Sequence, residues 1–207
     1  MGARSLIVLA LAACGGPPPA SPRPPASLPE RVVADFEAAV KQSKDAYVAL
    51  FDFAAVGEFE ILLHRYDLDG RLMNLEDDQK RQFIAEDGTP YPAERERRNV
   101  GNFYTILAQR TVGTGGCTAS EPRTRYGKLL GVAFEPLPAQ SEVTIGGQKV
   151  AKPTPPGYAV LRDHVNAWLA KGGVVGLRCS GGKGGLAIVY TARDNARGYD
   201  LITIYDD

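Results

Sequence analysis

The chain has 207 residues, and its 24 Lys and Arg balance its 24 Asp and Glu, so the formal net charge is zero. This balance argues against a nucleic-acid-binding protein, which needs a basic surface to displace counterions from phosphates. Hydrophobic residues make up 44% and charged residues 23%, as in an ordinary globular protein. No apolar run reaches the roughly 18 residues of a membrane-spanning helix, which excludes a polytopic membrane protein.

The N-terminus carries the pattern of an export signal. Arg4 precedes the short apolar run Leu6–Ala13, which ends in the tetrapeptide Leu11-Ala12-Ala13-Cys14. The tetrapeptide resembles the lipobox of bacterial lipoproteins, in which the cysteine becomes the acylated N-terminus. The resemblance implies a signal peptide over 1–13, lipidation of Cys14 and membrane lipid as a partner. It also implies a place in the bacterial cell envelope, at the outer membrane or the periplasmic face. A plain secretory signal, cut elsewhere, is the alternative.

A proline-rich linker is expected to follow, so that residues 14–29 comprise the lipidated Cys14 and this spacer. Seven of the 13 residues in 17–29 are proline, which favours extended polyproline II. At about 3.1 Å per residue, the spacer reaches roughly 40 Å from the bilayer. Residues 30–207 are predicted to form a single globular domain, with a helical half (30–112) and a sheet-rich half (113–207).

The cysteines predict a disulfide bond. With Cys14 given to lipid, Cys117 and Cys179 remain. The envelope is an oxidising compartment, in which two remaining thiols most often pair. The bridge would close a loop of about 60 residues and contribute roughly 4 kcal/mol in the chain-entropy model.

A second hypothesis makes Cys117 a nucleophile with His164 as its base, because an imidazole can take the thiol proton. This order of residues resembles the cysteine hydrolases of the cell-wall peptidase type. The sequence departs from that family in two ways. Pro122 follows the cysteine where the family has a long helix, and His164 lies in a helical pattern where the family has a strand.

Helices are expected in the first half, where apolar residues recur every three or four positions. Ser43, Lys44 and Asp45 interrupt the first pattern, and Asp45 is expected to cap the helix that follows. The charged run 94–98 is expected to be a solvated first turn, and Ile106 to lie on an apolar face. The expected helices lie over 28–53, in one or two pieces, and over 56–66, 77–86 and 94–110.

The second half predicts mostly strands, because β-branched and aromatic residues alternate with glycine-rich turns. Residues 142–152 read as a hairpin around Gly146-Gly147, and Tyr158–Ala170 reads as a helix. Residues 129–134 are a weaker strand candidate. Three further strands are expected as an antiparallel meander: Val174–Ser180, Leu186–Arg193 and Tyr199–Tyr205.

The order of elements predicts an α+β fold, with N-terminal helices followed by a C-terminal antiparallel β-meander packed on a helix. Tyr158–Ala170 is the one helix expected against that sheet. A helical pair followed by a curved antiparallel sheet is also weakly similar to the NTF2-like cone fold, although no motif supports that family.

Two motifs resemble ligand loops but depart from them. Asp67, Asp69 and Glu76 match calcium ligands of an EF-hand loop, but Arg65 occupies the first ligand position, so a turn is expected instead. Gly181–Gly185 contains a lysine, but it lacks the Ser or Thr and the helix of a phosphate loop. The two histidines, His64 and His164, lack zinc-site spacing, so we predict no metal and no cofactor.

These observations predict a lipid-anchored envelope protein that is a non-catalytic binding or assembly module. Its partner would be another envelope protein or a small ligand, and not nucleic acid. The alternative is an envelope cysteine hydrolase using Cys117 and His164. A third possibility is a structural lipoprotein without any ligand.

Overall fold

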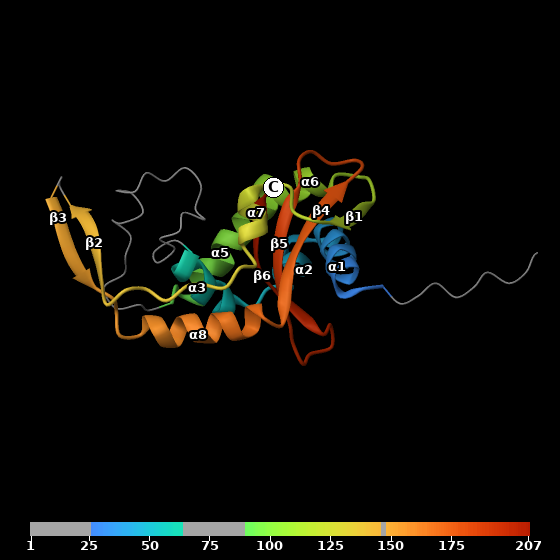
Figure 1. The fold of residues 1–207 in the computed structure, drawn as a ribbon. Helices are drawn as coiled ribbons and strands as arrows, with labels where there is room; N and C mark the ends of the chain where they lie inside the picture. Colours follow the sequence, from blue (N-terminus) through green and yellow to red (C-terminus); the bar gives the residue numbers. More distant parts are fainter. Residues whose placement is uncertain (1–25, 64–89, 146–147) are drawn as a thin grey trace, which may run out of the picture.

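The centre of the molecule is a four-stranded antiparallel sheet, in the order β1-β4-β5-β6 (Figure 1). This computed structural model describes residues 26–63, 90–145 and 148–207. The predicted C-terminal meander is confirmed, because β4, β5 and β6 pair consecutively. The sequence does not predict β1, which pairs with the remaining edge of β4. The strands are β1 (Cys117–Ser120), β4 (Gly172–Cys179), β5 (Leu186–Ala192) and β6 (Tyr199–Asp206).

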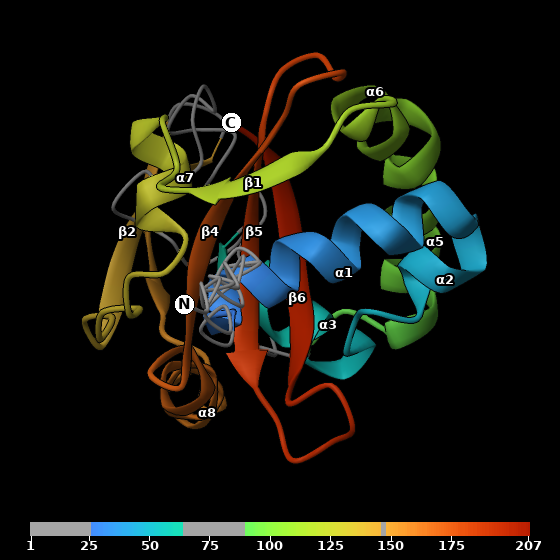
Figure 2. The same ribbon diagram turned by 90° about the vertical axis from the view of Figure 1, so that its right-hand side faces the viewer.

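Helices from the first half of the chain cover one face of this sheet. The long helix α1 crosses the strands, and shorter helices lie beside it (Figure 2). Their apolar residues form one buried cluster with Val175, Leu177, Ile188 and Leu201 of the sheet. The elements involved are α1 (Leu28–Gln42), α2 (Lys44–Val48), α5 (Ala93–Phe103), the π-helix η2 (Tyr104–Ala108) and α6 (Gln109–Val112).

The opposite face packs against α7 (Arg125–Leu129) and α8 (Tyr158–Leu169), which form a second buried cluster with Ala187, Val189 and Ile202. Helix α3 (Phe53–Ile61) contributes residues to both clusters. The α+β class is therefore confirmed, but the expectation that only 158–170 would cover the sheet is wrong. Because both faces are buried, β5 and β6 carry nearly continuous apolar runs.

A β-bulge in β6 changes which of its side chains point to each face of the sheet. Val189 pairs with Thr203, whereas the next residue of β5, Tyr190, pairs with Leu201. Ile202 is the extra residue, and it turns into the second cluster while Leu201 and Ile204 lie in the first. The bulge thus changes the alternation of side chains partway along the strand.

Several local predictions are confirmed. The hairpin β2 (Gln140–Ile145) and β3 (Gln148–Pro153) forms a separate two-stranded sheet that extends away from the main body (Figure 1). Residues 181–185 and 194–198 form the turns between the three C-terminal strands. Gly198 has a φ of 77°, a conformation that glycine adopts without strain.

The expected strand over 129–134 is wrong. Leu129 ends α7, whose first turn is capped by the Thr124 hydroxyl, which accepts a hydrogen bond from the Gly127 N–H at 2.9 Å. Leu130 and Phe134 are buried in the second cluster from an irregular segment. The edge of β4 is taken by β1, so no edge of that strand remains for these residues to pair with.

The helical pattern expected to begin at residue 28 is confirmed. Helix α1 begins at Leu28, where Ser27 and Glu30 form a capping box, so its first two residues overlap the end of the expected linker 14–29. The cap of the next helix differs from the expected one. Ser43, and not Asp45, caps α2, because its hydroxyl accepts a hydrogen bond from the Ala46 N–H at 3.0 Å.

The helix expected over 94–110 forms, with one π-helical stretch in its middle. Glu96, expected to be solvated, is only 4% exposed, and Ile106, expected to face the core, is 70% exposed. The wider π turn changes the angular position of the residues that follow, so a regular 3.6-residue periodicity misplaces Ile106. In the described parts of the chain, no helix combines the length and apolar character that crossing a bilayer requires.

Candidate functional site

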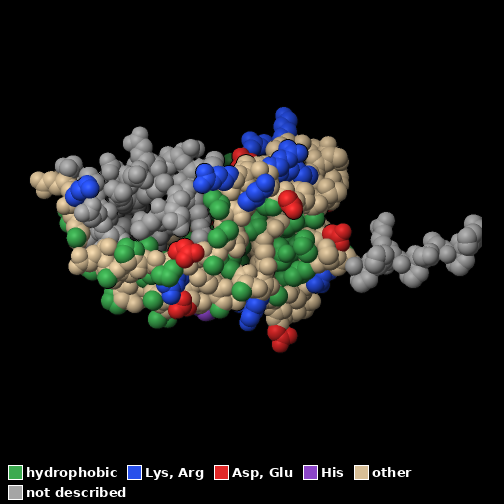
Figure 3. All heavy atoms as spheres, in the orientation of Figure 1, with side chains coloured by type: hydrophobic (Ala, Val, Ile, Leu, Met, Phe, Trp, Pro, Cys, Tyr) green, Lys and Arg blue, Asp and Glu red, His purple; other side chains and the backbone are tan. Residues whose placement is uncertain are grey.

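A groove of about 940 Å³ is lined by residues of α1, β1 and β4. Figure 2 shows how these three elements are arranged. The volume of the groove is near the top of the roughly 300–1,000 Å³ range of ligand sites. Pro29, Val33 and Ala34 line it from α1, and Val174 and Val175 line it from β4. Hydrophobic side chains gather on the side of the molecule where α1 meets the sheet (Figure 3). The remaining lining residues are Ala26, Ser27, Glu30 and the segment 117–121.

The groove is closed at one end by a link between the two walls. Glu37 of α1 accepts a hydrogen bond from the Cys117 N–H at 2.9 Å and pairs with Lys41 at 2.6 Å. Lys41 also donates to the Gly115 carbonyl at 2.8 Å. The Lys41 ammonium is the main cause that lowers the pKa of Glu37, so the carboxylate stays ionised and holds α1 against the start of β1.

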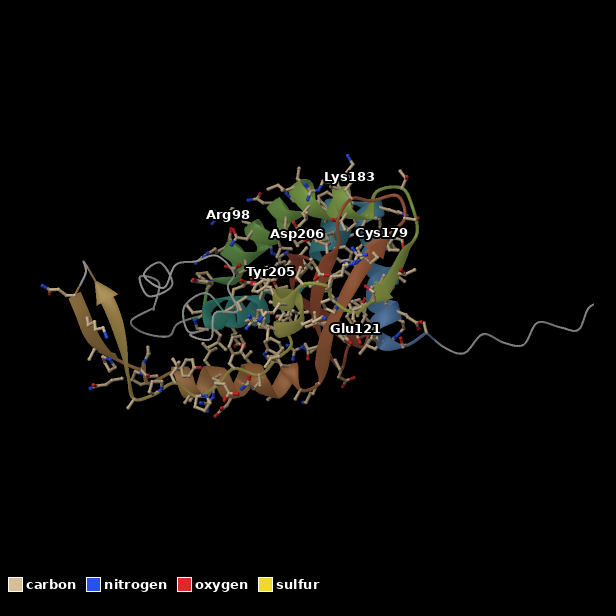
Figure 4. All side chains as sticks on the ribbon, turned by 45° about the horizontal axis from the view of Figure 1, so that its top comes forward. Arg98, Glu121, Cys179, Lys183, Tyr205 and Asp206 are labelled. Atoms are coloured by element: carbon tan, nitrogen blue, oxygen red, sulfur yellow. A yellow bond between two sulfur atoms is a disulfide. The ribbon has the colours of Figure 1, made fainter. Side chains whose placement is uncertain are left out.

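The predicted disulfide between Cys117 and Cys179 is confirmed, and it lies at this closed end. The two cysteines face each other across the ladder between β1 and β4. The bond therefore fixes the short strand β1 covalently to the edge of the sheet (Figure 4). This makes one wall of the groove rigid before any ligand arrives.

The backbone of β1 offers polar groups to the groove. The Ser180 N–H donates to the Gly116 carbonyl, so Gly116 and Ser180 form a hydrogen-bonded pair. In an antiparallel ladder such pairs alternate, which makes the pairs Cys117–Cys179 and Ala119–Leu177 non-hydrogen-bonded. The N–H and C=O of Cys117 and Ala119 therefore point away from β4, and Glu37 takes only the Cys117 N–H.

The charged residues that line the groove are acidic. Glu30 and Glu121 are both exposed and lie on opposite walls. The pKa of Glu30 is lowered, first by the hydrogen bond from the Ser27 N–H at 2.7 Å. The rim therefore favours cationic groups near an apolar base.

A second, smaller cavity of about 230 Å³ contains two buried carboxylates. Glu60 of α3 accepts hydrogen bonds from the Thr203 hydroxyl at 2.6 Å and from the Tyr205 hydroxyl at 2.8 Å. Glu96 of α5 accepts a hydrogen bond from Asn99 and pairs with Arg95, both at 3.3 Å. Burial, and next the charge of Glu60, raise the pKa of Tyr205 well above its ordinary value, so this hydroxyl remains a donor.

The structure does not bring Cys117 and His164 together. Cys117 packs against the cluster under α1, whereas His164 lies on α8, which covers the opposite face of the sheet. The Nδ1 atom of His164 lies 2.9 Å from Glu58 instead. A cysteine sulfur in a disulfide has no thiolate to act as nucleophile, so the hydrolase hypothesis gains no support from this arrangement.

Several predicted residues lie outside the described parts of the chain. These are the lipidation residue Cys14, the calcium-loop residues Asp67, Asp69 and Glu76, His64, and the expected helix 77–86. Within the described residues, no group of three or more His, Cys, Asp or Glu is placed to hold a metal ion.

Sequence reasoning missed Glu60, Glu96 and Tyr205, and the α1 wall of the groove. One signal was present for Glu60, because it and Glu58 are the two charged residues of an otherwise apolar run from Phe53 to Leu63. A carboxylate in such a run is usually buried with partners. The groove leaves no such local signal, because its walls come from distant segments.

Comparisons with known proteins add no family. No protein family model, no curated protein and no solved structure matches this chain. The NTF2-like analogy therefore stays an analogy.

Proposed function

We propose that this chain is a lipid-anchored protein of the bacterial cell envelope whose domain captures a partner or ligand in the groove between α1 and β1. The observation that carries the binding role is the groove itself, with its rigid strand wall, apolar base and acidic rim. The anchoring role rests on the lipobox-like sequence ending in Cys14.

The groove lies where the domain meets its expected tether. Ala26 and Ser27, at the end of the proline-rich segment, belong to its lining. A tether of extended proline residues would hold this end of the domain toward the membrane, where other envelope components are concentrated. Several acyl chains on Cys14 would make the anchoring stable.

The chemistry of the lining favours recognition over catalysis. It combines carboxylates, strand backbone groups and aliphatic side chains, which are the groups that orient and desolvate a ligand. Its cysteine, Cys117, is oxidised.

The anchor is tested by metabolic labelling with a palmitate analogue in a bacterial host. The wild-type chain should take up label and sediment with membranes, and Cys14→Ser should do neither. The double variant Cys14→Ser/Ser21→Cys is the control, because it restores a thiol outside the lipobox and should remain unlabelled. Labelling of Cys14→Ser equal to wild type would refute the anchor.

The binding role is tested with a photo-crosslinking amino acid placed at Ala34 or at Ala38 in cells. Both alanines are exposed on α1, but only Ala34 lines the groove. A discrete adduct is expected from position 34 and not from position 38, and its mass distinguishes a small ligand from a protein. Equal products from both positions, or none from position 34, would count against the groove as a binding site.

A further inference from the structure

The free edge of β1 is a place where another strand can pair. Ala119 directs its N–H and C=O away from β4, and Cys117 directs its C=O the same way. Within the described part of the chain, no hydrogen bond is made by the Cys117 C=O or by the N–H and C=O of Ala119. Strand residues rise about 3.3 Å each, so groups of alternate residues repeat at a spacing that an extended backbone matches.

The residues of β1 do not themselves protect this edge, and α1 occupies one of its groups, the Cys117 N–H, through Glu37. Proteins usually guard exposed edges with proline, lysine or a bulge. The strand reads Cys-Thr-Ala-Ser, and its ladder with β4 runs without a register shift. The disulfide holds the edge in place, so a partner does not have to order it on binding.

The lining of the groove specifies the side chains of such a partner. Side chains of a strand alternate between two faces, so an added strand would turn every second residue toward the base of the groove at Val175, the β4 residue that faces α1. Glu30 and Glu121 stand on the two walls. Their charges complement lysine or arginine on the incoming segment.

From these features we infer that the partner is an extended peptide segment, rich in alternating apolar and basic residues, that pairs with the free edge of β1 and lies along α1. This mode is β-strand addition, in which backbone hydrogen bonds supply affinity and side-chain pockets supply specificity. The inference rests on the proposed function and names the class of its partner.

The test uses the full chain in detergent micelles and a displayed library of random decapeptides. Enriched peptides are synthesised, and their affinities are measured for wild type, Ala34→Trp and the matched control Ala38→Trp. The expected peptides alternate apolar and basic residues. Ala34→Trp should weaken them at least about tenfold, whereas Ala38→Trp should not. Glu121→Lys should weaken them, and Glu135→Lys, at another exposed glutamate, should not.

Two further measurements report on strand pairing itself. N-methylation of single peptide residues should abolish binding at alternate positions only, because alternate amides face β1. Bound peptide should also slow hydrogen exchange of the Ala119 amide.

The outcomes separate the two proposals. Peptides that need an open groove, tolerate every N-methylation and leave the Ala119 amide unprotected would overturn strand addition and leave the groove as a binding site. A library without any binder sensitive to Ala34→Trp would also overturn the peptide inference. The photo-crosslinking experiment at position 34 would then show independently whether the groove binds any partner.

Discussion

The Cys117 N–H donates a hydrogen bond of 2.9 Å to the carboxylate of Glu37, and this bond joins β1 to α1. It lies beside the Cys117–Cys179 disulfide, so one end of the groove is fixed by a covalent bond and by a charged hydrogen bond. Ser27 and Glu121 also line the groove. Glu37 therefore helps to hold the two walls of the groove together.

Glu37→Ala should loosen the closed end of the groove. The change removes the Lys41 pair and the acceptor for the Cys117 N–H, and should lower the free energy of unfolding by about 1–2 kcal/mol. Because the pKa of Glu37 is lowered, this contribution is present above its ordinary value of 4.5 and is lost as pH falls through the folded pKa. Urea unfolding and exchange of the Cys117 amide measure it. Glu94→Ala, at an exposed helix position, is the control, and an unchanged Cys117 amide would contradict the assignment.

Asp207 should stabilise the fold except in strong acid. Burial alone would raise its pKa, but hydrogen bonds from the Arg123 N–H, Arg178 and Thr124 outweigh burial and lower the pKa from 3.8 to about 2. Its contribution is therefore complete above the unfolded value and is lost as pH falls through about 2. Asp207→Asn should cost about 1–2 kcal/mol at pH 7, allowing for solvent screening.

Thermal unfolding from pH 7 to pH 2 checks this expectation. The wild type should lose stability relative to Asp207→Asn in the acid range, and the two should converge near pH 2. The neighbouring exposed Asp206→Asn serves as the matched control. Parallel curves for wild type and Asp207→Asn across the whole range would show that the carboxylate has no special role.

The disulfide should dominate the stability of the β1 edge. Alkylation of the native chain, followed by intact mass, should modify neither Cys117 nor Cys179 until reductant is added. The double variant Cys117→Ala/Cys179→Ala should lose roughly 4 kcal/mol in the chain-entropy model. Rapid alkylation of Cys117 in the native chain would instead show a free thiol and would support the hydrolase hypothesis.

Glu60 should be required for packing between α3 and β6. Glu60→Leu leaves the hydroxyls of Thr203 and Tyr205 without this acceptor and should cost about 2–3 kcal/mol in unfolding free energy. Adding Tyr205→Phe should recover part of the loss, because one stranded donor is removed. Glu94→Leu, at an exposed site, is the comparison. Additive effects of Glu60→Leu and Tyr205→Phe in a double-mutant cycle would argue against the contact.

Parts of the fold could be predicted because their signals are local. The meander was predictable from apolar strands separated by glycine turns, and helix α8 from its 3.6-residue periodicity. Strand β1 was not, because four residues with two hydroxyl side chains carry no strand pattern, and only pairing with β4 makes them a strand. For residues 129–134 the error was the reverse, because a strand was predicted and none forms. The apolar residues of this segment are buried in the second cluster without pairing to a strand.

From the sequence alone, the α+β class followed from periodicity and turn residues, which act locally, and the pairing of Cys117 with Cys179 was predicted on the expectation that Cys14 carries lipid. Only the tertiary structure decided that both faces of the sheet are covered and that α1 stands beside β1. It also placed Glu60 with Tyr205, 145 positions apart. Such placements depend on how buried surfaces from distant segments fit together, and close packing is a property of the whole core.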